Sequence, residues 1–376
     1  MRIGYDAKRL YNNFTGLGNY SRTLVSNLIE FHPGEEYFLY TTKICSDPVV
    51  AKFRNNGKIR TRVARTPFKS LWRSFSVVSQ LKADNIDLFH GLSGEIPLNI
   101  QRSKIKSVVT VHDLIFRIYP DTYKPADRFF YDTKYRFACS RADKIVAISN
   151  STKNDLITYY GIGPSKIKVI YQACDPVFYH EADSITMKEV SLKYNLPKEF
   201  LLYVGSVIPR KNLLTIIKSL KILPAEYRIP LVVVGDGGAY KREVRNFITA
   251  EKLEKQVIWI EDLHESRQLK ALYNLASVFV YPSIYEGFGI PVAEALLSKV
   301  PVITSNCSSL PEAGGPVSIL TDPKSAEEIS LQIEKTLTDS ILREKMKNEG
   351  FKYASEKFSP GATAEEMIRT YYEVMA

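Results

Sequence analysis

The chain has little cysteine and none of the sequence patterns that commonly bind a metal. Its four cysteines, Cys45, Cys139, Cys174 and Cys307, lie far apart, and none belongs to a Cys-x-x-Cys pair. We therefore expect reduced thiols. The five histidines form no His-x-x-x-His pair, and Asp-x-Asp does not occur. Neither a zinc site nor the carboxylate clamp for a metal on a nucleotide diphosphate is indicated, so we expect no metal and no other cofactor.

Long apolar runs are also missing. No run approaches the roughly 20 residues that a helix needs to cross a bilayer. The N-terminus, Met1 to Asp6, is typical of a strand rather than of a signal peptide. A hydrophobic fraction of 45% and a charged fraction of 24% are those of a soluble globular protein. At 376 residues the chain is too long for one ordinary core. We expect two domains and a cytoplasmic location.

Acidic residues are scarce in the first half of the chain. Residues 1–178 hold 27 Lys and Arg against 15 Asp and Glu, whereas the remainder holds 24 against 26. The densest basic run, Lys52–Arg73, contains no acid and includes Phe68, Leu71 and Trp72. An anionic membrane, a nucleic acid or an acidic acceptor could bind such a run. A solvated basic face is the simpler alternative.

Short apolar runs alternate with amphipathic helical patterns along the whole chain, which indicates parallel α/β domains. The predicted strands are Arg2–Tyr5, Tyr37–Tyr40, Ile86–His90, Ser107–Val111, Lys144–Ile148, Lys166–Ile170, Phe200–Val204, Leu231–Val234, Val257–Ile260, Ser277–Tyr281 and Val300–Thr304. The polar, aperiodic stretch Tyr179–Lys188 predicts an interdomain linker. We predict one domain over residues 1–178 and a second over 179–355. A last helix, within 356–376, is expected to pack back toward the first domain.

Two loops of the first half have residues that suit a ligand site. Gly16 and Gly18 precede a predicted helix, where they would let the backbone approach a ligand at the helix N-terminus. His112 and Asp113 directly follow the strand Ser107–Val111, at the edge where parallel sheets bind ligands. The structural alternative for this pair is a capping Asp beside a partly buried His.

A third loop carries two adjacent cations. Arg210 and Lys211 follow the strand Phe200–Val204 and precede a helix that is predicted to begin near Asn212. Two cations beside free backbone N–H groups suit a diphosphate, especially where no metal ligand is in sight. An adjacent Arg-Lys pair is also common on surface loops that bind nothing.

The fourth loop has two carboxylates around glycines. Glu286 and Glu294 are eight residues apart, with Gly287 and Gly289 between them and Pro291 at the first turn of a predicted helix. Both carboxylates can then face the space above the end of the strand Ser277–Tyr281. Alternatively, Glu286 caps the helix and Glu294 is a solvated helix residue.

In this order, the loops resemble the retaining GT-B glycosyltransferases of family 4, also called glycosyl transferases group 1. The most specific match is the Glu-x7-Glu motif of Glu286 and Glu294. The other matches are Gly16–Gly18, His112-Asp113, Ile148–Lys153, Gly205–Asn212 and Ser305–Glu312, whereas Ala313–Pro316 departs from the family's usual pattern. The resemblance covers nearly the whole chain. It implies an α/β GT-B fold, with two Rossmann-like doubly wound parallel-sheet domains facing a cleft.

The resemblance also implies an activity. A hexose of mannosyl or glucosyl type would pass from a UDP- or GDP-sugar to a glycan or lipid-linked acceptor in surface polysaccharide synthesis, with retained anomeric configuration. Arg210 and Lys211 would hold the diphosphate, Glu286 the sugar and Glu294 the ribose, while His112 would contact the sugar near its anomeric centre. The implied donor-binding residues are Gly16, Gly18, Arg210, Lys211, Glu286, Gly287, Phe288, Gly289, Ile290 and Glu294. The run Lys52–Arg73 would place the enzyme on the inner face of an anionic membrane.

Two other functions compete with this interpretation. A sugar-nucleotide epimerase of the same two-domain architecture would need no acceptor. A nucleic-acid-binding protein would account for the sequence pI of 9.1. The chain has no recognisable nucleic-acid-binding module, however, and that function leaves Glu286, Glu294, Arg210 and Lys211 unexplained. We therefore expect no nucleic-acid partner.

Overall fold

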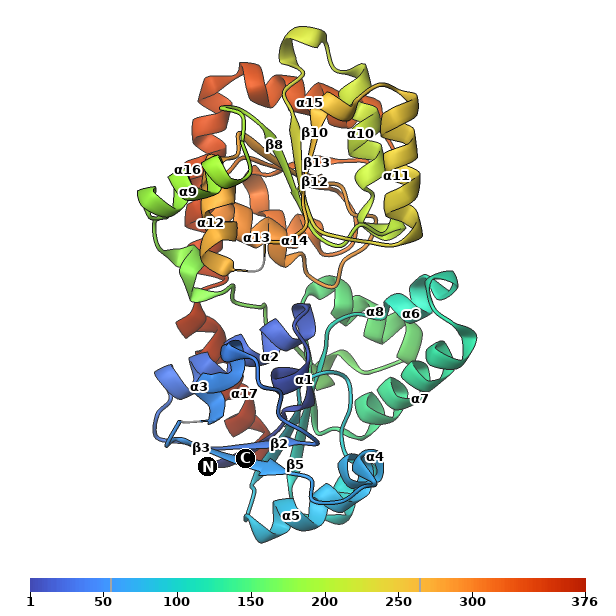
Figure 1. Cartoon of the computed structure of the whole chain (residues 1–376). Helices are drawn as coiled ribbons and strands as arrows, with labels where there is room; N and C mark the ends of the chain where they lie inside the picture. Colours follow the sequence, from blue (N-terminus) through green and yellow to red (C-terminus); the bar gives the residue numbers. More distant parts are fainter. Residues whose placement is uncertain (55, 264) are drawn as a thin grey trace. The chain divides into compact units, whose positions relative to one another are not determined.

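The computed structural model describes residues 1–54, 56–263 and 265–376. The chain divides into two compact units (Figure 1). Unit 1 comprises Met1–Ala173 together with Ser359–Ala376, and unit 2 comprises Cys174–Phe358. Each unit is an α/β domain with one parallel sheet, so the predicted fold class of two doubly wound sheets is confirmed.

The sheet of unit 1 has seven parallel strands in the order β3-β2-β1-β4-β5-β6-β7. They are β1 (Arg2–Asp6), β2 (Glu36–Thr41), β3 (Ile59–Val63), β4 (Leu88–Gly91), β5 (Lys106–Val111), β6 (Lys144–Ala147) and β7 (Ile167–Val169). Helices lie between them: α1 (Lys8–Asn12), α2 (Gly16–Phe31), α3 (Ala51–Arg54), α4 (Lys69–Leu71), α5 (Val77–Ala83), α6 (Ile115–Ile118), α7 (Pro125–Arg141) and α8 (Asn150–Tyr160). The strand order reverses between β1 and β4, and such a switch point is where open α/β sheets bind ligands.

The last helix of the chain, α17 (Pro360–Met375), belongs to unit 1. It packs against α2 and β5. Ala364, Met367, Ile368 and Tyr371 are buried and recur at helical spacing, so one face of α17 lies in the core of this unit.

The sheet of unit 2 has six parallel strands in the order β10-β9-β8-β11-β12-β13. They are β8 (Leu201–Val204), β9 (Leu231–Val234), β10 (Val257–Ile260), β11 (Val278–Tyr281), β12 (Val302–Ser305) and β13 (Ile319–Thr321). Its helices are α9 (Ser184–Lys193), α10 (Leu213–Ile222), α11 (Ala239–Ala250), α12 (Ser266–Leu275), α13 (Ile290–Leu297), α14 (Leu310–Gly314), α15 (Ala326–Thr338) and α16 (Ser340–Lys357). Here the order reverses between β8 and β11, which places the loops after these two strands side by side.

Three features of the fold differ from the sequence prediction. β3 lies inside the basic run as a half-buried edge strand, and β13 has only three residues, so neither produced a long apolar signal. The predicted linker Tyr179–Lys188 contains the start of α9, whose first N–H groups are capped by the Asp183 carboxylate. The chain passes from unit 1 to unit 2 between Ala173 and Cys174 instead.

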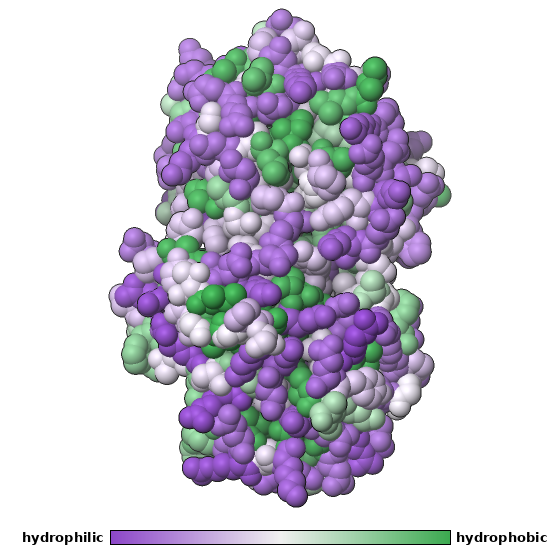
Figure 2. All heavy atoms as spheres, turned by 180° about the vertical axis from the view of Figure 1, so that it is seen from behind, coloured by the Kyte–Doolittle hydropathy of each residue, from purple (hydrophilic) through white to green (hydrophobic). Residues whose placement is uncertain are grey.

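The surface is mostly hydrophilic on the face in Figure 2, where hydrophobic residues form separate patches. Among the described residues, no helix combines the length and hydropathy that a bilayer-spanning helix needs.

Candidate active site

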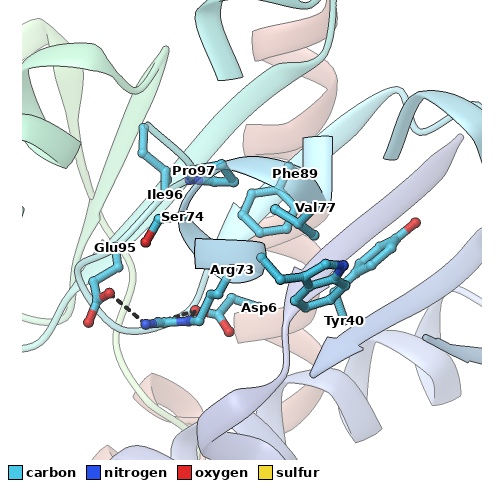
Figure 3. Close-up of a pocket in the computed structure, with 10 residues that line it drawn as sticks. Asp6, Tyr40, Arg73, Ser74, Val77, Phe89, Glu95, Ile96 and Pro97 are labelled. Atoms are coloured by element: carbon cyan, nitrogen blue, oxygen red, sulfur yellow. Dashed lines mark hydrogen bonds and ion pairs between the residues drawn. The ribbon is translucent and has the colours of Figure 1, made fainter. Parts of the chain in front are cut away.

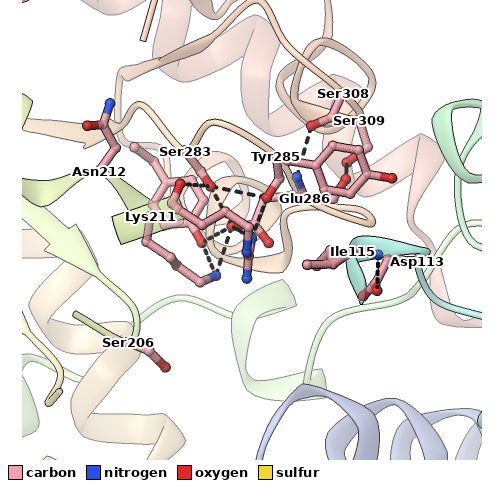
Figure 4. Close-up of polar contacts among 12 residues, drawn as sticks. Asp113, Ile115, Ser206, Lys211, Asn212, Ser283, Tyr285, Glu286, Ser308 and Ser309 are labelled. Atoms are coloured by element: carbon pink, nitrogen blue, oxygen red, sulfur yellow. Dashed lines mark hydrogen bonds and ion pairs between the residues drawn. The ribbon is translucent and has the colours of Figure 1, made fainter. Parts of the chain in front are cut away.

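Two loops of unit 2 meet at the switch point. The loop that contains Arg210 and Lys211 follows β8, and the loop that contains Ser283 and Glu286 follows β11 (Figure 4). The Ile284 N–H donates to the Arg210 carbonyl at 2.8 Å, and the Ser283 hydroxyl donates to the same oxygen at 3.0 Å. These bonds fasten the loops together, so the two cations and Glu286 come into contact.

The Glu286 carboxylate is the centre of this cluster. It is buried, and its Oε1 atom is contacted by four polar groups. They are Arg210 Nη1 at 3.0 Å, Lys211 Nζ at 2.9 Å, Ser283 Oγ at 2.8 Å and Tyr281 OH at 3.0 Å. Burial by itself raises the pKa of this carboxyl, but Lys211 and Arg210 outweigh burial and lower the pKa to about 2. Glu286 is therefore ionised at neutral pH.

Arg210 and Lys211 are held in place by further contacts. Lys211 Nζ donates to the Tyr281 hydroxyl at 2.5 Å, and Arg210 Nη1 donates to the Tyr285 carbonyl. Asn212 adopts a left-handed backbone conformation with φ 61°, and its amide donates to the Pro282 carbonyl at 3.0 Å. α10 begins at the next residue, as predicted. Both cationic side chains keep about 15% of their surface exposed, so an anion can reach them.

The glycine loop leads directly into α13. Gly289 has φ 108°, and a Cβ atom there would lie 2.7 Å from Leu310 Cδ2, so this position needs glycine. The Ser309 hydroxyl donates to the Glu286 carbonyl at 2.9 Å and the Phe288 carbonyl at 2.8 Å. α13 begins at Ile290. The Val292 N–H donates to the Gly289 carbonyl at 2.9 Å, and Pro291 has no N–H, so of the first amide groups of α13 only that of Ile290 is left without an acceptor in this turn.

Glu294 lies inside α13 in a different environment. Most of its side chain is covered by protein although the residue is not fully buried, and its Oε2 accepts a hydrogen bond from the Tyr273 hydroxyl at 3.1 Å. Burial raises its pKa to about 8, and Asp175 contributes in the same direction. The two glutamates of the motif therefore differ in charge. Glu286 is a carboxylate at neutral pH, whereas Glu294 is largely protonated before a ligand binds.

The predicted glycines of unit 1 lie at the start of α2. A Cβ atom on Gly18 would lie 1.8 Å from the Asn13 carbonyl oxygen, so only glycine fits there. Gly16 is exposed, and no atom lies within 4 Å of where its Cβ would be. Glycine is thus required at position 18 by close packing, whereas the space beside Gly16 is empty.

His112 is buried at the end of β5. Its Nε2 lies 2.9 Å from the Leu92 carbonyl, so Nε2 carries the proton. Burial lowers its pKa to about 4, and the imidazole is neutral at neutral pH. Asp113 Oδ1 accepts a hydrogen bond from the Ile115 N–H, two residues further along the chain, at 3.1 Å.

Sequence reasoning missed several residues that build the site. Tyr281, Ser283 and Ser309 orient Glu286 and its loop, and Tyr273 binds Glu294. The sequence could have indicated Ser283, because it stands three residues before Glu286, which is the spacing of a Ser-x-x-Glu capping box. Ser309 lies within the matched segment Ser305–Glu312, whereas Tyr273 reaches the site from α12, so only the fold reveals Tyr273.

The basic run of unit 1 is not a continuous free basic face. Arg60 pairs with Glu36 at 3.4 Å and Arg62 with Asp84 at 2.6 Å. Arg73 binds Asp6, and binds Glu95 at 2.6 Å, in a small pocket that Tyr40, Val77, Phe89, Ile96 and Pro97 also line (Figure 3). Three of the eight Lys and Arg residues in the run Lys52–Arg73 thus form ion pairs with acidic residues from elsewhere in the chain.

Comparison with known proteins agrees with this fold. The family described as Glycosyltransferase Family 4 matches residues 14–178, and the family described as Glycosyl transferases group 1 matches residues 186–353. Together with the two doubly wound sheets, these matches define a GT-B glycosyltransferase. The chain belongs to family 4, group 1, of the glycosyltransferases, as its motifs indicated.

Individual relatives give the same result. The O-antigen chain mannosyltransferase B of Escherichia coli is 28% identical over 359 residues, which is 92% of each chain. The serotype-specific mannosyltransferase WbdA of E. coli is 32% identical over 311 residues, or 77% of this chain and 36% of WbdA. The structure of HepE from Anabaena, in complex with UDP and glucose, superposes with a TM-score of 0.78 at 17% identity, covering 99% of this chain and 100% of HepE. HepE therefore supports the fold.

Proposed function

We propose that this glycosyltransferase moves a hexose of mannosyl or glucosyl type from a nucleoside diphosphate sugar to a glycan or lipid-linked acceptor in surface polysaccharide synthesis. The transfer retains the anomeric configuration and needs no metal. The observation that carries the proposal is the contact of Arg210 and Lys211 with buried Glu286 at the switch point of unit 2. The two mannosyltransferase relatives support the sugar and the pathway class, and the UDP and glucose bound to HepE support the donor class.

Arg210 and Lys211 supply the positive charge that the leaving diphosphate needs. Breaking the sugar–phosphate bond leaves negative charge on the nucleoside diphosphate. Both cations already lie within 3.0 Å of one carboxylate oxygen, so little reorganisation is required when the donor binds. An ammonium has three N–H donors and a guanidinium five, so each keeps donors for phosphate oxygens while Glu286 holds it in place.

Glu286 acts in this proposal as a hydrogen-bond acceptor for sugar hydroxyls. A carboxylate with a pKa of about 2 that is bound by two cations is a weak nucleophile. This favours attack of the acceptor on the same face of the sugar, assisted by the leaving phosphate, over a covalent glycosyl–enzyme intermediate. Neutral His112 would contact the sugar near its anomeric centre, and Glu294 would bind the ribose hydroxyls. Backbone groups from Gly287 to Ile290 would support the sugar and phosphate, and Gly16 and Gly18 would face the phosphate and acceptor.

A product analysis tests the proposal. The purified enzyme is first screened with UDP- and GDP-sugars by thermal shift, because a ligand that binds the folded state raises the melting temperature. Transfer from the best donor is then followed by NMR in EDTA. We expect a product with the donor's anomeric configuration, at a rate that EDTA leaves unchanged. An inverted product, or a rate that returns only with added Mg²⁺, would contradict the proposal. An epimer formed without any acceptor would favour the epimerase alternative.

We also propose that unit 1 binds the anionic inner face of a membrane, where a lipid-linked acceptor would be found. The proposed surface comprises the second half of the run Lys52–Arg73 together with α7, instead of the whole run. Phe68, Leu71, Phe129 and Phe130 are each more than half exposed. Exposed cations accompany them at Arg65, Lys69, Lys124 and Arg128, with Asp127 among them. α7 and the segment after α4 both bind Glu95, through Lys134 and Arg73, so the two parts are neighbours.

Vesicle binding tests this surface. The variant Phe129→Ser/Phe130→Ser should lose about tenfold in affinity for vesicles that contain anionic phospholipid, because two apolar side chains no longer enter the interface. The matched control is Ile185→Ser/Leu192→Ser on α9, where both side chains are more than half exposed in unit 2. We expect the control to bind anionic vesicles like the wild type. Neither the wild type nor the control should bind zwitterionic vesicles. Equal binding by both variants would show that the surface does not contact lipid.

A further inference from the structure

A continuous chain of buried polar side chains connects α17 with His112 inside unit 1. The Tyr371 hydroxyl lies 2.6 Å from His90 Nδ1, and His90 Nε2 lies 2.8 Å from Thr110 Oγ1. Thr110 Oγ1 lies 3.0 Å from the Tyr20 hydroxyl. The ring of Tyr20 then meets the ring of His112 edge to face, with centroids 4.6 Å apart and an interplanar angle of 89°. All five side chains are buried.

The hydrogen bonds of this chain depend on one another. Burial lowers the pKa of His90 to about 3, so its ring is neutral and has one donor nitrogen and one acceptor nitrogen. The tautomer of His90 therefore sets the direction in which the hydroxyls of Tyr371 and Thr110 point. Thr110 is the central member, because its single hydroxyl serves both His90 and Tyr20. Without the Thr110 hydroxyl, His90 Nε2 and the buried Tyr20 hydroxyl lose this hydrogen-bond partner.

Two contacts fix the ring of His112. The Leu92 carbonyl accepts a hydrogen bond from Nε2, and the ring can change its orientation only by turning about its Cβ–Cγ bond. The ring of Tyr20 packs against the imidazole and opposes this turn. The direction of the second nitrogen, Nδ1, therefore depends on where the Tyr20 side chain is held, and its hydroxyl is held by Thr110.

We propose that Tyr20, Thr110, His90 and Tyr371 are positioning residues that set the orientation of the His112 ring, so that the last helix of the chain contributes to the geometry of transfer. The catalytic consequence rests on the role of His112 in the proposed function. The orientation of the His112 ring does not rest on the proposed function, because it can be measured in the ligand-free enzyme.

The pair Thr110→Val and Thr110→Ser tests this inference. Val has the shape of Thr without the hydroxyl, whereas Ser keeps the hydroxyl. We expect Thr110→Val to lower kcat by about tenfold while the donor KM stays within about twofold, because a misplaced group acts on the transition state rather than on ground-state binding. Thr110→Ser should restore most of kcat. In spectra of enzyme labelled at histidine, assigned with His112→Gln, the ring signals of His112 should shift in Thr110→Val and return in Thr110→Ser.

A second variant shows whether a change in Thr110→Val comes from the hydrogen-bonded chain or from a loss of folding. Tyr371→Phe removes only the far hydroxyl, and it should shift the His112 signals in the same direction by a smaller amount. The matched control is Tyr11→Phe, which removes another buried tyrosine hydroxyl of unit 1, bound to Thr61 at 2.8 Å. The control should leave the His112 signals unchanged. Unchanged His112 signals in both Thr110→Val and Tyr371→Phe would overturn the inference. Shifted signals with wild-type kcat would support the positioning role and contradict the proposed role of His112 instead.

Discussion

Replacement of Lys211 by alanine is expected to lower kcat for sugar transfer by roughly 10²–10³-fold, the effect of removing one preorganised charge-stabilising donor from an active site. Lys211 Nζ lies 2.9 Å from the Glu286 carboxylate and 2.5 Å from the Tyr281 hydroxyl. In the proposed mechanism it meets the charge that grows on the leaving diphosphate, so its loss raises the barrier of the chemical step. The measurement is steady-state transfer from the donor found in the thermal-shift screen.

Lys221→Ala is the matched control for this variant. Lys221 belongs to α10 in the same unit and forms an exposed ion pair with Glu251 at 2.6 Å. Exposed pairs contribute little, so the control should keep wild-type kcat and stability. If the folded Lys211→Ala variant had the same kcat as Lys221→Ala, the Lys211 ammonium would have no role in transfer.

Replacement of Glu286 by glutamine is expected to lower both activity and stability. Activity should fall about 100-fold, because Arg210 and Lys211 lose the anion that places them and the sugar loses a charged acceptor. The variant should also unfold more easily at pH 7, by about 3 kcal/mol, since a buried ion pair that loses one partner leaves uncompensated charge. Urea unfolding and transfer rates measure the two effects.

The pH dependence of stability gives an independent check on Glu286. Its pKa is about 2 in the folded enzyme, below the ordinary value for glutamate. The stabilisation is therefore complete above the unfolded pKa of roughly 4.3 and is lost as the pH falls from there toward 2. The stability difference between wild type and Glu286→Gln should shrink over that range. A stability difference that stayed constant with pH would contradict the ion-pair geometry.

Much of the site could be predicted because it depends on local sequence patterns. Arg210 and Lys211 follow one strand, and Glu286 follows another. Parallel strands end at the same edge of a sheet, so residues that follow neighbouring strands come together once the strand order is known. The positive φ of Gly289 and the start of α13 were likewise visible as a glycine before Ile290-Pro291.

The remaining features depend on partners that are distant in sequence. Arg73 is neutralised by Asp6, 67 residues away, so its charge could not be assigned from the basic run alone. Glu286 and Glu294 are equivalent in the motif, yet two cations hold one ionised while burial keeps the other largely protonated. The Asp113 carboxylate accepts a hydrogen bond from the Ile115 N–H, a local contact that the sequence motif alone does not reveal.

The central claim is that Arg210 and Lys211 bind the diphosphate of the donor without a metal. Calorimetric titration of UDP and of GDP into the enzyme in EDTA tests it most directly, with the folded Arg210→Ala/Lys211→Ala variant beside the wild type. We expect one of the two nucleotides to bind the wild type in EDTA and the double variant to bind it at least about 100-fold more weakly. Equal affinity in the two proteins, or binding that requires added Mg²⁺, would contradict it.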